Sequence, residues 1–307
     1  MANNSRTGAE PRSGRFPPWL RKRIPAGGEA AAVNGILREL GLATVCSGAH
    51  CPNLPECYAR GTATFLILGK SCTRSCRFCA IPSEPPGEPR ADEPEAVAEA
   101  CARLGLRYVV ITSVTRDDLA DGGAGHFALT IAAVRRRLPT AVIEVLTPDF
   151  RGSEAAIDTV IDAAPDIFNH NIETVPRLYA SIRPQADYAR SLAVLAHGKR
   201  HAGARDLRLW TKSGLMVGLG ETPAEVSAAL GDLRGAGCDI VTIGQYLAPS
   251  ASHAPVVEFV DPVQFAAWDA EARGLGFASV ASGPFVRSSY HAEEVFGSIS
   301  PRSTHRG

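Results

Sequence analysis

ATFLILGKSCTRSCRFCA, residues 63–80, joins a short apolar run to three closely spaced cysteines. The run Thr64–Leu68 has the length and composition of a strand. Cys72, Cys76 and Cys79 follow it with the spacing C-x3-C-x2-C. Ligands of parallel α/β folds bind beyond the carboxyl ends of the strands, so the sequence places these cysteines at the ligand-binding end of a sheet.

Outward from this stretch, strand-like and helix-like patterns alternate. The further strand-like runs are Tyr108–Ser113, Ala141–Leu146, Ile167–Ile172, part of Leu207–Leu219, and Ile240–Leu247. Helical patterns separate them at Pro94–Leu104, Ala124–Leu138, Glu154–Ala163, Asp187–His201 and Pro223–Ala236. Crossovers of this length pair strands in parallel, and the chain after Leu247 is too short for an eight-unit barrel, although Ala278–Phe285 is a possible further strand. The predicted fold is α/β, a partial (β/α)6 TIM-type barrel with N- and C-terminal extensions.

The overall composition is that of a folded globular chain without a polyanion-binding charge. Of the 307 residues 45% are hydrophobic and 21% charged, and 32 basic residues balance 32 acidic ones. The balance gives no general attraction to nucleic acid or to an anionic membrane, and no apolar run reaches the roughly 18–20 residues that span a bilayer. We therefore expect neither a nucleic-acid partner nor a membrane.

Cysteine usage indicates a reduced compartment. Six of the eight cysteines lie between positions 46 and 79, and the chain is long, rich in core residues and without the apolar region of a secretory signal. The expected location is the cytoplasm, or an organelle matrix if the basic N-terminal residues form a transit peptide. Cys101 and Cys238 stand apart and are interpreted as buried small hydrophobic residues on helical faces.

The triad Cys72, Cys76 and Cys79 predicts an iron–sulfur site. Three thiolates can hold three irons of a 4Fe-4S cluster and leave the fourth iron open to another ligand. The alternative is a structural zinc site, but structural zinc usually has four protein ligands. The pattern favours the cluster.

The form C-x3-C-x-Phe-C resembles the signature of the radical S-adenosylmethionine superfamily. A second triad, Cys46, Cys51 and Cys57, has the rarer spacing C-x4-C-x5-C. Together the two triads resemble the lipoyl synthase family, and the resemblance covers nearly the whole chain. Further matching stretches are RDDL at 116–119, HNIETVP at 170–176, GLGET at 218–222, and RSSY at 287–290.

This resemblance implies an activity and its cofactors. It implies insertion of two sulfur atoms at carbons 6 and 8 of a lysine-linked octanoyl group, with two S-adenosylmethionine molecules consumed at the Cys72/Cys76/Cys79 cluster. A second 4Fe-4S cluster, held by Cys46, Cys51, Cys57 and Ser289, donates the sulfur. Ser288 is the alternative oxygen ligand. No side chain is expected to act as a catalytic acid or base.

The resemblance also implies partners. These are an octanoylated lipoyl carrier domain (the H protein, or a 2-oxoacid dehydrogenase component of E2 type), a reductant such as ferredoxin or flavodoxin, and an iron–sulfur carrier that rebuilds the second cluster. Two alternatives stay open: another two-cluster radical enzyme of methylthiotransferase type, and a non-catalytic zinc-binding module.

Candidate S-adenosylmethionine contacts are chosen from the predicted strand ends and the cysteine loop. They are Phe78, Thr112, Asn171, Glu173 and Lys212. Asn171 and Glu173 suit ribose hydroxyls, Phe78 suits adenine, and Lys212 suits the methionine carboxylate. Each has a plain structural alternative: Glu173 could pair with Arg183, Lys212 could be a solvated charge, and Thr112 could be strand packing.

Four segments are predicted along the chain. Residues 1–30 form a flexible basic arm, and 31–61 form an N-terminal extension with the second cysteine triad. Residues 62–280 form the radical enzyme barrel. Residues 281–307 form a C-terminal extension with the RSSY motif.

Overall fold

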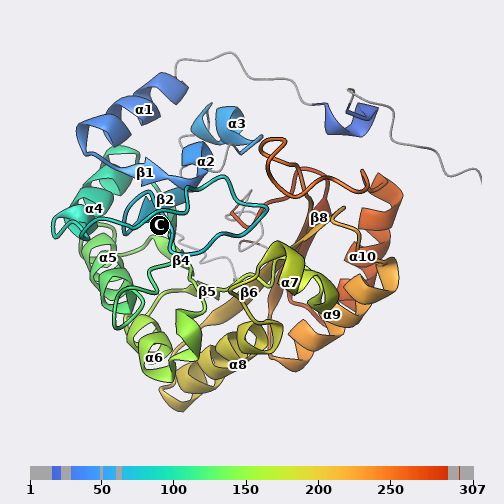
Figure 1. Cartoon of the computed structure of the whole chain (residues 1–307). Coiled ribbons are helices and arrows are strands. Elements are labelled where there is room, and N and C mark those ends of the chain that lie inside the picture. Colours follow the sequence, from blue (N-terminus) through green and yellow to red (C-terminus); the bar gives the residue numbers. More distant parts are fainter. Residues whose placement is uncertain (1–15, 22–28, 49–50, 60–63, 290–296, 298–307) are drawn as a thin grey trace, which may run out of the picture.

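The computed structural model describes residues 16–21, 29–48, 51–59, 64–289 and 297. Eight strands form one sheet whose spatial order equals their order in the chain (Figure 1). They are β1 Ala43–Thr44, β2 Thr64–Ile67, β3 Tyr108–Ser113, β4 Val142–Leu146, β5 Ile167–Asn169, β6 Trp210–Val217, β7 Ile240–Gln245 and β8 Ser279–Gly283.

The sheet is an open, mostly parallel barrel. Strands β2 to β8 pair in parallel and β1 pairs antiparallel with β2. Within the described residues β1 and β8 are the two edges, so the barrel does not close. This confirms the partial barrel, and the possible seventh parallel strand forms as β8.

Helices pack around the outside of the strands (Figure 1). The crossover helices are α4 Glu93–Arg103, α5 Ala124–Arg137, α6 Glu154–Asp162, α8 Tyr188–Ala204, α9 Pro223–Gly235 and α10 Pro262–Gly274. Caps fix several starts: Thr222 and Glu225 form a capping box on α9, and Ser153 caps α6. The short elements are η1 Pro18–Leu20, η2 Phe150–Gly152, η3 Pro176–Leu178 and α7 Tyr179–Ile182.

Each crossover helix buries an apolar face against the strands. On α4, Val97, Ala100 and Cys101 are fully buried, as are Phe65 and Ile67 of β2. The interpretation of Cys101 as a buried core residue is confirmed. Cys238 is also fully buried, but it lies in the loop after α9 and not on a helix face.

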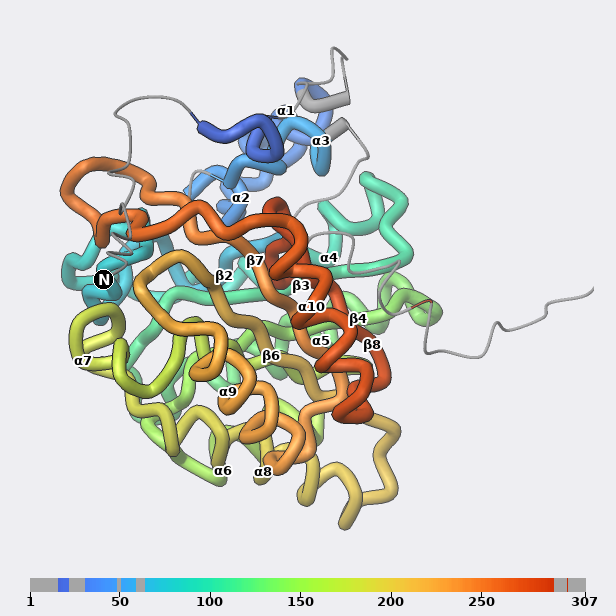
Figure 2. The backbone as a smooth tube through the Cα atoms, turned by 90° about the vertical axis from the view of Figure 1, so that its right-hand side faces the viewer, coloured from blue at the N-terminus to red at the C-terminus, as the bar shows by residue number. Residues whose placement is uncertain are grey.

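The elements before β2 gather on one side of the barrel. They are α1 Glu29–Glu39, α2 Val45–Gly48 and α3 Leu54–Ala59 (Figure 2). The amide of Asn53 donates to the carbonyl of Phe285 at 2.7 Å, so the segment after β8 reaches the same side. Of the predicted N-terminal arm only residues 16–21, 29 and 30 are described, and the ring of Phe16 packs edge-on against that of Phe259. No helix among the described residues is long and apolar enough to cross a membrane.

Candidate active site

A cavity of about 470 Å³ opens at the carboxyl ends of the strands. Its walls come from the ends of β3 to β7, the loop after β2, the segment around α2 and the segment after β8. The volume falls within the roughly 300–1,000 Å³ of small-molecule sites. Five of the six clustered cysteines line it: Cys46, Cys51, Cys72, Cys76 and Cys79.

A strained turn directs the cysteine loop from β2 into the cavity. Leu68 has a φ of +67°, which is unusual for a residue with a Cβ, and both its backbone groups are held. Its N–H donates to the carboxylate of Glu93 at 2.8 Å, and its carbonyl accepts from Arg116 at 3.0 Å. A Cβ on Gly123 would lie 2.3 Å from the Leu68 side chain, so a glycine is required beside this turn.

The first triad is fixed to the barrel by backbone contacts. The Sγ of Cys72 accepts from the N–H groups of Arg74 at 3.4 Å and Thr115 at 3.3 Å. The N–H of Arg77 donates to the carbonyl of Ile182, and that of Cys79 donates to Cys76. The loop is therefore positioned from the ends of two other crossovers.

Burial affects two thiols of this triad, those of Cys76 and Cys79. It raises the pKa of Cys76, against the opposing charge of Arg183, and it raises the pKa of Cys79 to about 12. A coordinating metal reverses this preference, because thiols bind metals as thiolates.

The second triad lies in the segment before β2, on α2, on α3 and between them. Cys46 is buried on α2, Cys57 is on α3, and the N–H of Cys51 donates to the carbonyl of Cys46 at 3.0 Å. Burial raises the pKa of Cys46, against hydrogen bonds from the backbone and side chain of Thr64. Cys57 is not among the residues that line the cavity.

The segment after β8 brings Arg287, Ser288 and Ser289 to the cavity, beside the second triad. The hydroxyl of Thr64, which contacts Cys46, donates to the Oγ of Ser289 at 2.9 Å. Ser288 instead hydrogen-bonds with the side-chain amide of Asn171, at 2.8 and 3.0 Å. Arg287 lies within the electrostatic reach of Cys51, although burial lowers the pKa of its guanidinium. Tyr290, the last residue of the motif, lies outside the described residues.

Two glycines leave room for this segment. A Cβ on Gly244 of β7 would lie 2.1 Å from the carbonyl oxygen of Val286. One on Gly214 of β6 would lie 2.9 Å from the Oγ of Ser288. The segment therefore rests directly on the backbone of the barrel.

The cysteines fit iron–sulfur clusters better than single zinc ions. All eight are free of disulfides. In the described part of the chain, one group of three His, Cys, Asp or Glu side chains has all its ligand atoms within 4.8 Å, and it contains no cysteine. Zinc with bonds of ~2.3 Å to sulfur holds its ligands about 3.8 Å apart. The three Sγ atoms of neither triad all lie within that distance of one another, whereas the cysteines that hold a four-iron cluster lie further apart than those that hold a single zinc ion.

Four of the five candidate S-adenosylmethionine contacts line the cavity: Phe78, Thr112, Asn171 and Glu173. The amide of Asn171 donates to the carboxylate of Glu173 at 3.1 Å. Burial raises the pKa of Glu173, against the charge of Arg183. Thr112 donates its hydroxyl to the carbonyl of Leu146 at 2.8 Å, as a strand-packing residue does.

Lys212 lies elsewhere. It is buried in the barrel interior, where its ammonium contacts both carboxylate oxygens of Glu144 at 2.9 Å. It is not among the cavity-lining residues, so this placement does not favour its predicted contact with the methionine carboxylate. The alternative prediction, that Lys212 is a solvated charge, is wrong, because Lys212 is 1% exposed.

The sequence analysis did not propose Arg74, His170 or Arg183 as residues of the cavity. Arg74 pairs with Asp117 at 2.7 Å and with Asp149 at 2.6 Å. His170 hydrogen-bonds through Nδ1 with the carbonyl of Thr147, and Arg183 donates to the carbonyls of Asn171 and Ile172. Arg74 stands inside the quoted cysteine motif and His170 directly precedes Asn171, so their positions carried a signal. No sequence pattern indicated that Arg183 lines the cavity.

Known proteins support the reading of this site. Residues 66–233 match the family model of the radical SAM superfamily. The chain is 54% identical over 285 residues to a lipoyl synthase of Nitratidesulfovibrio vulgaris, covering 93% of this chain and 94% of that one. It is 56% identical over 281 residues to a lipoyl synthase of Methylococcus capsulatus, covering 91% and 86%.

Solved structures of low sequence identity share the fold. The crystal structure of HydG, a maturase of the [FeFe]-hydrogenase, matches with a TM-score of 0.56 at 15% identity, over 76% of this chain and 53% of that one. Because the superfamily match covers the first triad, a 4Fe-4S cluster and S-adenosylmethionine are the cofactors of the barrel. The chain is a radical SAM enzyme of the sulfurtransferase type, and it belongs to the lipoyl synthase family.

Proposed function

We propose that this chain inserts sulfur at carbons 6 and 8 of an octanoyl group attached to a lysine of a lipoyl carrier domain. Two S-adenosylmethionine molecules are consumed at the Cys72/Cys76/Cys79 cluster. A second 4Fe-4S cluster, held by Cys46, Cys51, Cys57 and Ser289, is the sulfur-donating substrate. The observation that carries the proposal is the hydrogen bond from Thr64 to Ser289, which joins the RSSY segment to the second triad.

The choice of Ser289 over Ser288 follows from their partners. Ser289 contacts Thr64, which also contacts Cys46. The hydroxyl of Ser288 is engaged by Asn171 on the opposite side of the cavity mouth. A single oxygen ligand among thiolates makes one weaker bond to iron, which suits a cluster that must release sulfur.

The cavity between the triads suits an aliphatic chain. Apolar side chains line it beside the cysteines: Val45, Leu66, Ile81, Leu146, Leu215, Met216, Leu247 and Val286. When bound at the first triad, the cluster and S-adenosylmethionine supply a carbon-centred radical that abstracts hydrogen from an unactivated C–H bond. The chain's residues bind the cofactor at Asn171 and Glu173 and exclude water with this apolar wall.

The partners follow from this reaction. They are an octanoylated carrier domain (H protein, or 2-oxoacid dehydrogenase component of E2 type), a reductant such as ferredoxin or flavodoxin, and an iron–sulfur carrier for rebuilding. Free thiols at all eight cysteines suit a reducing compartment, and we place the chain in the cytoplasm.

The test is an anaerobic reaction with the cluster-loaded full chain, reductant, S-adenosylmethionine and an octanoylated lipoyl-domain peptide. Mass spectrometry measures the lipoyl product, and chromatography measures 5′-deoxyadenosine in the same sample. Ser289→Ala is expected to keep S-adenosylmethionine cleavage and to lose the lipoyl product. Ser288→Ala is the matched control and is expected to keep product formation. An unchanged product yield from Ser289→Ala would remove Ser289 from the reaction.

A further inference from the structure

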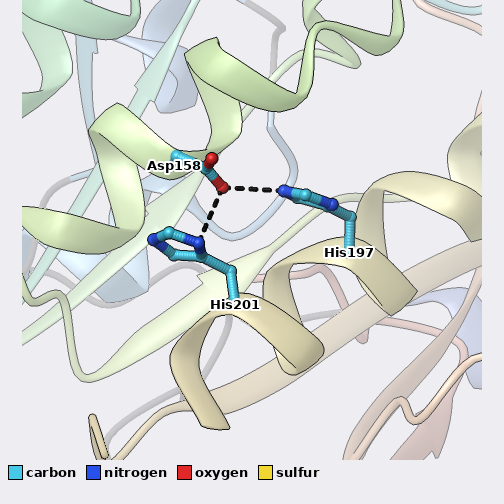
Figure 3. Close-up of side chains that lie close together, drawn as sticks. All are labelled: Asp158, His197 and His201. Atoms are coloured by element: carbon cyan, nitrogen blue, oxygen red, sulfur yellow. Dashed lines mark hydrogen bonds and ion pairs between the residues drawn. The ribbon is translucent and has the colours of Figure 1, made fainter. Parts of the chain in front are cut away.

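A cluster of histidines and carboxylates lies on the outer face of the barrel, between α6 and α8. His197 and His201 are one turn apart on α8, and both point toward Asp158 on α6 (Figure 3). None of the three lines the cavity described above. Among the described residues they are the one group of three potential metal ligands whose ligand atoms all lie within 4.8 Å of one another.

One oxygen of Asp158 meets both rings. Its Oδ1 is 2.7 Å from the Nε2 of His197 and 3.0 Å from the Nδ1 of His201. The other nitrogen of each ring faces a second carboxylate. The Nδ1 of His197 is 3.1 Å from Glu154, and the Nε2 of His201 is 2.9 Å from Asp162.

Each ring therefore faces two carboxylates, one at each nitrogen. A neutral imidazole has a single N–H and can donate to only one of the two carboxylates that face it. If the outer nitrogens donate to Glu154 and Asp162, the inner nitrogens of His197 and His201 point their lone pairs at the anionic Asp158. A cation at the point where these three groups meet removes that repulsion.

We propose that Asp158, His197 and His201 bind a divalent transition-metal ion of the zinc, nickel or cobalt class. Two imidazoles and a carboxylate are ligands these metals accept, whereas magnesium and calcium prefer oxygen ligands alone. Glu154 and Asp162 then take the place of the carboxylates that commonly receive the outer N–H of metal-bound histidines and fix the ring orientation.

The distances fit such an ion. Bonds of ~2.1 Å to nitrogen and oxygen put neighbouring ligand atoms about 2.9–3.4 Å apart. The contacts of 2.7 and 3.0 Å at Asp158 lie close to this range, and all three ligand atoms lie within 4.8 Å of one another. The side chains of His197 and His201 are 15% and 18% exposed, so water can complete the coordination. The ion joins α6 to α8 and is independent of the sulfur chemistry proposed above.

The test is isothermal titration of zinc chloride into the cluster-loaded chain under anaerobic conditions, where the clusters occupy the cysteines. The wild type is expected to bind one more zinc ion per chain than His197→Gln, His201→Gln or Asp158→Asn. Arg200→Gln, a change at an exposed position on the same helix, is the matched control and is expected to bind as the wild type does. Equal stoichiometry in the wild type and the three variants would overturn the proposal.

A second measurement does not depend on how the variants fold. X-ray absorption at the zinc edge, after one equivalent of zinc is added to the wild type, is expected to show nitrogen and oxygen neighbours with imidazole scattering. Sulfur neighbours would assign the bound zinc to the cysteines and refute the site.

Discussion

The two cysteine triads share one cavity but are held in different ways. The loop with Cys72, Cys76 and Cys79 is fixed by residues of the barrel itself, through Thr115, Ile182 and the turn at Leu68. The triad at Cys46, Cys51 and Cys57 belongs to the segment before β2, and residues beside it contact the far end of the chain. The bond between Asn53 and Phe285 spans 232 residues, and that between Thr64 and Ser289 spans 225.

The first triad is therefore held within one part of the barrel, whereas the second depends on contacts between distant segments of the chain. The first triad is in place once β2 and its neighbouring crossovers have folded. The contacts around the second triad extend to the segment that follows β8. Under our proposal the first cluster persists through the reaction and the second gives up its sulfur, so a cradle that opens at one ligand suits the second.

The largest expected effect comes from removing one ligand of each triad. Cys76→Ala is expected to reduce both 5′-deoxyadenosine and lipoyl product to the detection limit, because the first cluster loses a ligand. Cys46→Ala is expected to abolish only the product. Both compounds are measured by mass spectrometry in one anaerobic reaction. Cys101→Ala, a buried cysteine outside both triads, is the control and should retain both. Loss of 5′-deoxyadenosine in Cys46→Ala would show that the triads do not act separately.

The next effect concerns the ion pairs that hold the first triad. Although burial opposes it, the hydrogen bonds and charge of Arg74 hold the pKa of Asp149 well below its usual range. Arg74→Met leaves that buried carboxylate without its main partner, at an expected cost of ~3–5 kcal/mol in the free energy of unfolding. Urea titration measures the loss. Arg77→Met, at an exposed position in the same loop, should cost far less; equal losses would contradict a specific role for Arg74.

Local sequence patterns predicted the surroundings of the first triad better than those of the second. The run at 64–68 and the cysteine spacing are local signals, and the structure has the strand and the cavity where they indicate. The link of Ser289 to Cys46 came only through a family resemblance, since no local pattern relates residues so far apart in the chain. The burial of Lys212 was not predicted, because its partner Glu144 lies on another strand and nothing in the residues around Lys212 indicates that contact.

A smaller effect is the pH dependence of the free energy of unfolding that comes from His170, a residue of the cavity wall. Burial, followed by the charge of Arg183, lowers the pKa of His170 to about 4, against about 6.5 for an unfolded histidine. The folded state therefore resists protonation, so this contribution is complete above pH ~6.5 and is lost as the pH falls toward 4. The loss amounts to ~3 kcal/mol, and His170→Gln should flatten the pH dependence of the urea midpoint over this interval. Parallel curves for variant and wild type would refute the assignment.

The smallest effect tests docking of the C-terminal segment alone. Gly244→Ala puts a Cβ 2.1 Å from the carbonyl oxygen of Val286, a backbone atom that can yield only if the segment moves. Overpacking of this kind costs ~1–3 kcal/mol, which weakens docking by a factor of about 5 to 150. Lipoyl product should fall by up to that factor, while 5′-deoxyadenosine formation stays near the wild-type rate. Gly231→Ala, at an exposed position on α9 with no atom within 4 Å of the added Cβ, is the matched control. If Gly244→Ala lowers both readouts equally, the segment after β8 also supports the first triad. The two triads would then not be held by separate parts of the chain.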